Sequence, residues 1–130
     1  MQGLHLTADC HHCRCDAALL VDANALLQLC LKSVAAAGLQ AVNQLVHEFP
    51  AVAGVKSGVT ATVLLAESHL CIHTWPEIQA VTLDVYVCNF GGDHSAKAHC
   101  LMDTLLAAFK PESTDRHELR RGTLIETKDS

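Results

Sequence analysis

The sequence predicts a two-layer α+β sandwich in which a mainly antiparallel sheet carries two helices on one face. Short segments alternate between apolar and polar residues, as strands do, and two longer segments repeat apolar residues every three or four positions, as helices do. Most strand segments follow one another directly, in the order β-α-β-β-β-β-α-β, so neighbours can pair as antiparallel hairpins. The 130 residues suit one domain, 1–130. Because both helices cover the same face, we expect a second copy of the chain to cover the other.

The first third of the chain predicts a strand, a helix and a second strand. Gly3–Asp9 alternates apolar with polar or small residues and indicates a strand. Asp22 suits the N-cap of a helix that runs to about Ala37, and Gln40–Phe49 is the second strand, which a proline ends. The apolar stripe of this helix consists of Leu26, Leu27, Cys30, Leu31 and Val34.

Three further strands follow a loop rich in Pro, Gly and Ser at residues 50–58. They are Gly58–Glu67, which is apolar and β-branched, His69–Trp75, and Gln79–Cys88. The last of these alternates cleanly, which predicts that one face of the strand is buried. Its apolar side holds Val81, Leu83, Val85 and Val87, and its polar side holds Thr82, Asp84, Tyr86 and Cys88.

The final third predicts a helix and one more strand. Gly91-Gly92 turns the chain, Asp93 caps the helix, and apolar residues line the inner face of that helix as far as Phe109. After Pro111 we expect a polar link and then a short strand near Glu118–Glu126.

Composition limits the possible partners. Half of the residues are hydrophobic, the formal net charge is −5, and Lys and Arg cluster only at Arg120-Arg121, which argues against nucleic acid. No apolar run is long enough to span a bilayer, so no membrane partner is expected. Seven cysteines without a signal-peptide pattern predict thiols in a reducing cytoplasm.

A C-x₂-C pattern near the start of the chain suggests a zinc site, but no second pair of ligand residues follows it. Structural zinc commonly takes four ligands from two separated pairs, and the other cysteines beyond Cys10, Cys13 and Cys15 stand singly. We therefore expect no metal, and we interpret this segment as a thiol-rich loop after the first strand. The remaining histidines outside the motif discussed next are interpreted as ordinary polar side chains: His5, His47, His94, His99 and His117.

The stretch LLAESHLCIHTWPE concentrates reactive residues at the end of an apolar strand. From the residues alone, Ser68, His69 and His73 with Asp84 suggest a hydrolase triad, although the Gly-x-Ser-x-Gly turn is missing. Cys88 with His73 could instead form a thiol nucleophile and its base. Spacing alone does not choose between these two arrangements and a merely polar strand end.

A family resemblance favours a third reading. The run AESHLCIHTWPE, followed by LDVYVC, resembles the S-adenosylmethionine decarboxylase proenzymes of bacteria and archaea. The opening GLHLTADCHHC, the His47-Glu48-Phe49 element and Arg121-Gly122 are similar to the same family, so the resemblance covers nearly the whole chain.

The resemblance implies a self-processing enzyme. The chain would cut itself at Glu67–Ser68 into a β chain, 1–67, and an α chain, 68–130, and Ser68 would become a covalent pyruvoyl cofactor. That group would form a Schiff base with S-adenosylmethionine and remove its carboxylate, giving the aminopropyl donor for spermidine synthesis. The active form would be a homodimer of processed protomers.

The resemblance also implies roles for single residues. His73 would be the base for self-cleavage, Thr60 would support processing, and Cys88 would return a proton to the substrate. For substrate binding, Phe49 would stack on adenine and Glu77 would contact the ribose hydroxyls. No metal is implied.

Three departures from the family pattern concern processing and specificity. Thr60-Ala61 replaces the usual Ser-Gly, the loop after Phe49 is longer and carries Lys56, and Cys71 replaces Thr or Ser. The alternatives that stay open are a pyruvoyl-dependent ornithine or arginine decarboxylase, a non-catalytic paralogue that is never processed, and a zinc module.

Overall fold

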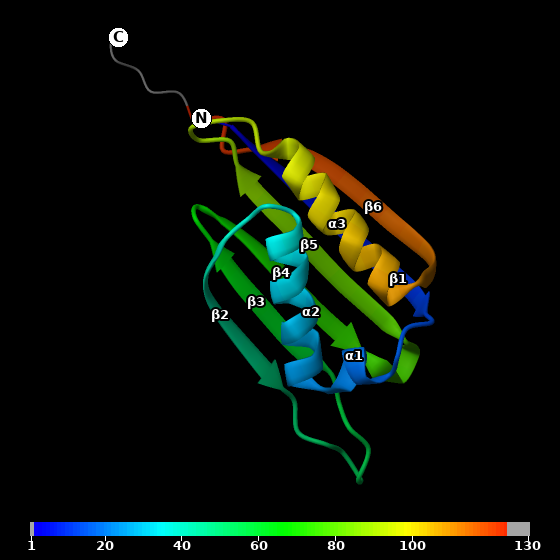
Figure 1. Cartoon of the computed structure of the whole chain (residues 1–130). Helices are drawn as coiled ribbons and strands as arrows, with labels where there is room; N and C mark the ends of the chain where they lie inside the picture. Colours follow the sequence, from blue (N-terminus) through cyan, green and yellow to red (C-terminus); the bar gives the residue numbers. More distant parts are fainter. Residues whose placement is uncertain (1, 125–130) are drawn as a thin grey trace.

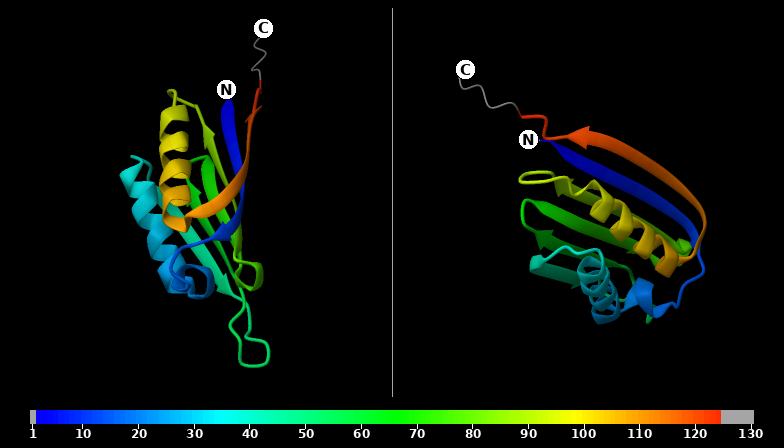
Figure 2. Two further views of the ribbon diagram at one scale, coloured as in Figure 1. Left: turned by 90° about the vertical axis from the view of Figure 1, so that its right-hand side faces the viewer. Right: turned by 45° about the horizontal axis from the view of Figure 1, so that its top comes forward.

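The computed structural model describes residues 2–124 and confirms the predicted two-layer α+β sandwich. Its six-stranded sheet has the order β2-β3-β4-β5-β1-β6, and every neighbouring pair is antiparallel. The helices lie on one face of the sheet, and none of the described residues forms a layer over the opposite face, called the open face below (Figures 1 and 2). The elements are β1 (Gly3–Cys13), α1 (Ala18–Val21), α2 (Ala23–Ala36), β2 (Ala41–Glu48), β3 (Val59–Leu65), β4 (Ser68–Trp75), a 3₁₀ turn η1 (Pro76–Ile78), β5 (Ala80–Cys88), α3 (Ser95–Phe109) and β6 (Pro111–Arg121).

The core lies between the sheet and the helices. The alternation predicted for β5 is confirmed, because its odd-numbered apolar residues are buried under the helices while Thr82, Asp84 and Tyr86 are only partly buried. The same period in β3 and β4 buries one apolar side of each strand on the helix-covered face of the sheet. The largest fully buried side chains include Phe109, Leu26, Leu70, Ile72, Leu101, Met102 and Leu105.

Asp22 caps α2 as the sequence predicts. Its carboxylate accepts hydrogen bonds from the backbone N–H groups of Asn24 and Ala25, which the first turn of the helix leaves without partners. The prediction for the second helix needs correction, because His94 is the capping residue of α3. Asp93 instead accepts a hydrogen bond from the N–H of Ser95, and this bond lowers the pKa of its carboxyl.

Two strand predictions are wrong in position. The segment with the C-x₂-C pattern is not a loop, because β1 continues to Cys13 and pairs there with Pro111 of β6. The last strand begins at Pro111 and ends at Arg121, earlier than the predicted 118–126, and residues 125 and 126 lie outside the described residues. The first error arises because the alternation in β1 breaks at His11 and His12, which are both exposed. The second arises because β6 is an edge strand with almost every side chain exposed, so its sequence lacks the alternation that marks a half-buried strand.

Candidate active site

The predicted cleavage site lies in the tight turn that joins β3 to β4. Leu65 pairs with Ser68 across the hairpin, so only Ala66 and Glu67 form the turn. Glu67 has a φ of 55°, in the left-handed region that residues other than glycine rarely adopt. Such a conformation stores about 1–3 kcal/mol. The backbone immediately before Ser68 is therefore strained.

Ser68 and Cys88 are neighbours at this end of the sheet. The backbone N–H of Cys88 donates a hydrogen bond to the Ser68 hydroxyl oxygen over 3.0 Å, and the Cys88 residue is only 7% exposed. Glu67, Ser68 and Cys88 all line one cavity of about 340 Å³ beside the ends of α2 and α3. His94 and Lys97 of the α3 region line the same cavity.

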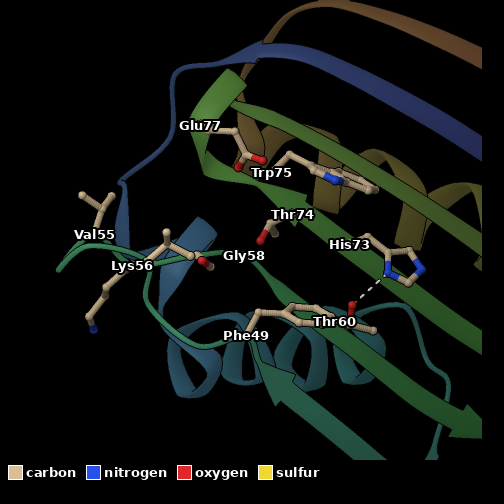
Figure 3. Close-up of a pocket in the computed structure, with 11 residues that line it drawn as sticks. Phe49, Val55, Lys56, Gly58, Thr60, His73, Thr74, Trp75 and Glu77 are labelled. Atoms are coloured by element: carbon tan, nitrogen blue, oxygen red, sulfur yellow. Dashed lines mark hydrogen bonds between the residues drawn. The ribbon is translucent and has the colours of Figure 1, made fainter.

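His73 lies at the other end of β4, in a second cavity of about 540 Å³ (Figure 3). Its Nδ1 is 2.9 Å from the Thr60 hydroxyl oxygen, so the threonine found in place of the family's serine still contacts this imidazole. Phe49 and Glu77, the two residues predicted to bind substrate, line this cavity as well. The structure thus brings together four of the residues that the family resemblance singled out.

Aromatic and apolar groups form much of this second cavity. The Phe49 ring packs edge-on against His47 with 4.7 Å between centroids, and the His73 and Trp75 rings are 6.0 Å apart. Lys56 also lines the cavity, but its ammonium end points away from the aromatic side chains (Figure 3).

The two groups of site residues are well separated within one chain. Ser68 and His73 are five residues apart on the same strand, which corresponds to about 16 Å at the usual rise per residue. An odd separation also directs their side chains to opposite faces, Ser68 toward the helices and His73 toward the open face. Neither the Ser68–His73 pair of a hydrolase nor a Cys88–His73 pair therefore exists within a single chain.

A polar network that the sequence did not predict lies on the open face near Ser68. Asp84 Oδ2 is 3.0 Å from His5 Nε2 and 3.1 Å from His69 Nε2. The Tyr86 ring packs against both imidazoles, with centroid distances of 5.9 Å and 5.8 Å. Asp84 and His69 do not form a triad with Ser68, because the Ser68 hydroxyl contacts the Cys88 N–H.

The thiols of the C-x₂-C pattern belong to the core. Cys10 and Cys13 are buried, and burial raises the pKa of Cys10 to about 12 and that of Cys13 to about 11. Zinc binds the thiolate, so this environment opposes the form that the metal needs. In the part of the chain that the structure describes, the only group of three side chains spaced for a metal is His5, His69 and Asp84.

Within residues 2–124, no helix combines the length and apolar character needed to cross a membrane.

Comparisons with known proteins agree with the family resemblance. A family model described as "S-adenosylmethionine decarboxylase" matches residues 4–122. Curated proteins named "S-adenosylmethionine decarboxylase proenzyme" are similar to the chain. The one from Picrophilus torridus is 33% identical, covering 95% of this chain and 86% of its own, and the one from Aquifex aeolicus is 36% identical, covering 95% and 84%.

A solved structure extends the similarity to three dimensions. The crystal structure of the adenosylmethionine decarboxylase from Aquifex aeolicus aligns with a TM-score of 0.80 and 32% identity, over 98% of this chain and 96% of that one. The family match, the curated relatives and this structure all span nearly the whole chain, and therefore the chain belongs to the S-adenosylmethionine decarboxylase family.

Proposed function

We propose that the chain is a pyruvoyl-dependent S-adenosylmethionine decarboxylase that matures by cutting itself between Glu67 and Ser68. The observation that carries this proposal is the position of Ser68, which follows a strained turn residue and adjoins Cys88. The word "proenzyme" in the names of the curated relatives supports a self-processed product. The family membership supports the choice of reaction and substrate.

The residues around Ser68 fit a pyruvoyl group. The Cys88 N–H that now donates to the Ser68 hydroxyl is a donor that could serve a carbonyl oxygen on residue 68. The group, once formed, supplies a ketone that takes up the electron pair released with carbon dioxide. Cys88 would hold the proton on its sulfur and return it to the substrate carbon, since this residue lines the same cavity as Ser68.

Self-cleavage needs a nucleophile and a base. The Ser68 hydroxyl would attack the Glu67 carbonyl carbon, which converts the amide into an ester, and the strain in the turn favours that shift. Removal of the Ser68 α-proton would then eliminate the ester, which frees the Glu67 carboxylate at the end of the β chain and leaves a dehydroalanine that hydrolyses to pyruvoyl and ammonia. His73 would take this proton, and Thr60 would orient its ring through the 2.9 Å contact.

The separation of Ser68 from His73 supports a homodimer in which the site is shared. In an isologous dimer whose two-fold axis runs across the strands, the Ser68 end of each open face meets the His73 end of the partner. Each site would then combine Ser68 and Cys88 of one chain with the Phe49 cavity of the other. Exposed apolar side chains on the open face, including Leu45 at 76% and Leu64 at 47%, favour coverage by a second copy.

The Phe49 cavity favours a purine nucleoside over a basic amino acid. The aromatic rings of Phe49 and Trp75 offer stacking surfaces, and Glu77 supplies a carboxylate for hydroxyl groups. Ornithine and arginine would offer no ring to stack. A panel of the three compounds with the matured protein tests this choice, and S-adenosylmethionine should be the compound that releases carbon dioxide.

Intact-mass measurement tests self-cleavage. The purified wild-type chain should give two fragments, one of which reacts with borohydride as a ketone does, whereas Ser68→Ala should remain at 14.0 kDa. Ser113→Ala, an exposed serine on β6, is the matched control and should cleave normally. A wild-type chain that stays intact would refute the proposal and favour a non-catalytic paralogue. Two fragments from Ser68→Ala would show that the cut lies elsewhere.

We also propose a cytoplasmic location. The buried thiols of Cys10, Cys13 and Cys30 suit a reducing compartment, where they remain unpaired core residues.

A further inference from the structure

The network around Asp84 joins three adjacent strands beside the cleavage site. His5 on β1, Tyr86 on β5 and His69 on β4 occupy one row across the sheet, because His5 pairs with Tyr86 and Tyr86 pairs with His69. Asp84 lies two residues before Tyr86 on the same face of β5. His69 directly follows the residue that self-cleavage would convert, so this network reaches the new end of the α chain.

The hydrogen bonds define the proton positions in the network. A carboxylate only accepts, so the Nε2 atoms of His5 and His69 must both donate to Asp84. The Arg121 guanidinium donates to His5 Nδ1 over 3.2 Å, which agrees with a neutral His5 ring carrying its proton on Nε2. A metal ion would need the lone pairs of both Nε2 atoms and would lie near the Arg121 charge. We therefore interpret the cluster as a hydrogen-bonded anchor.

Packing holds the aromatic member of the network in place. Arg121 lies over the Tyr86 ring, 4.6 Å from its centroid. A Cβ added to Gly3 would come within 2.5 Å of Tyr86 atoms, and one added to Gly122 within 2.8 Å of the Tyr86 hydroxyl oxygen. The ring therefore occupies space that only glycine leaves free on both neighbouring segments. This packing explains why an arginine followed by a glycine suits positions 121 and 122: the arginine covers the Tyr86 ring, and the glycine leaves room for the Tyr86 hydroxyl.

Cleavage removes the restraints that hold residue 68 in the precursor. The covalent turn to β3 is lost, and so is the amide nitrogen of residue 68 itself. His69 then becomes the first residue of the α chain with both a backbone N–H and a side chain that binds its surroundings. Its imidazole reaches across to Asp84 and packs on Tyr86, which keeps the strand end on β5 beside Cys88.

We infer that Asp84 is a positioning residue, which holds His69 so that residue 68 stays beside Cys88 after the chain is cut. This inference rests on the proposed function, because the anchor matters only in the cleaved protein. In the precursor, the covalent turn between β3 and β4 holds residue 68 beside Cys88. The loss of Asp84 should therefore have a much larger effect after cleavage than before it.

Hydrogen exchange measured before and after cleavage tests the inference. In cleaved Asp84→Ala, which removes the acceptor oxygen, the peptide that begins at residue 69 should exchange at least about tenfold faster than in the cleaved wild type. In the uncleaved Ser68→Ala background, the same substitution should change that exchange by less than about twofold. The control is Asp115→Ala, which removes the exposed 3.0 Å contact with His11 at a distance from the cut. It should alter neither form.

Kinetics give a second readout. A displaced residue 68 should lower kcat by about tenfold or more while KM changes little, because the substrate cavity around Phe49 is intact. If Asp84→Ala does not fold, His69→Phe keeps the ring on Tyr86 but lacks the N–H donor, and it should give the same two results. Equal exchange in cleaved and uncleaved Asp84→Ala would refute the anchor, as would metal binding that Asp84→Ala abolishes. A wild-type chain that never cleaves would instead refute the proposed function.

Discussion

Co-expression of two variants can decide whether each active site is shared between two chains. The first variant, His73→Ala, keeps the proposed cleavage site but lacks the proposed base. The second, Ser68→Ala, keeps the proposed base but lacks the proposed cleavage site. Because Ser68 and His73 are about 16 Å apart on one strand and face opposite sides of the sheet, the proposed role of His73 as the base requires that it act on Ser68 of the partner subunit.

The geometry determines the expected extent of cleavage. When two variants assemble at random from equal amounts, about half of the His73→Ala chains pair with a Ser68→Ala partner. Those chains receive His73 from that partner and should be cut. The others pair with their own kind and should stay intact, so cleavage should stop at about half of the His73→Ala chains.

Intact-mass spectrometry with a tag on one variant measures this fraction without an activity assay. His73→Ala expressed alone is the control, and it should remain at the full length. Co-expression that leaves every His73→Ala chain uncut would refute the shared site. Complete cleavage of His73→Ala expressed alone would show that His73 is not the base.

Two further predictions concern the stability of the uncleaved Ser68→Ala protein. Thr74→Val should lower the free energy of unfolding, measured in urea, by about 2–4 kcal/mol. The buried Thr74 hydroxyl donates to the Leu20 carbonyl oxygen over 2.7 Å and accepts from the Val59 N–H over 2.8 Å, and valine can make neither bond. The control Thr82→Val, on the open face, should change the free energy of unfolding little. Stability should also fall as the pH rises from about 9 to about 12, since burial raises the pKa of Cys30 to about 12 and the unfolded chain then loses its thiol proton first. Cys30→Ala should flatten that decline, and an unchanged slope would refute this origin.

Much of the fold could be predicted because it depends on local patterns. The alternation in β5 and the Asp22 cap of α2 are signals within a few residues, and both are confirmed. The exposed edge strand β6 carries no such signal, because neither of its faces is mostly apolar. Its position follows from pairing with β1, at the other end of the sequence.

The candidate site shows the same limit. The resemblance singled out His73 and Thr60, and the register of β3 and β4 does place them in contact. Ser68 and His73 face opposite sides of the sheet because side chains alternate along a strand and the two residues are an odd number of positions apart. This argument requires that Ser68–Trp75 be one continuous strand, which only the structure shows. His5, His69 and Asp84 come together because of how β1 and β4 pair with β5, and no local sequence pattern predicts that pairing.

The strand order has a consequence for the matured protein. β1 belongs to the segment before the proposed cut, yet it is hydrogen-bonded on one side to β5 and on the other to β6, and both of these strands come after that cut. The two products of the proposed cleavage would therefore interleave within one sheet, and neither could separate without exposing the interior of the other. Breaking one peptide bond should therefore yield a two-chain protomer that unfolds as a unit and does not dissociate on dilution.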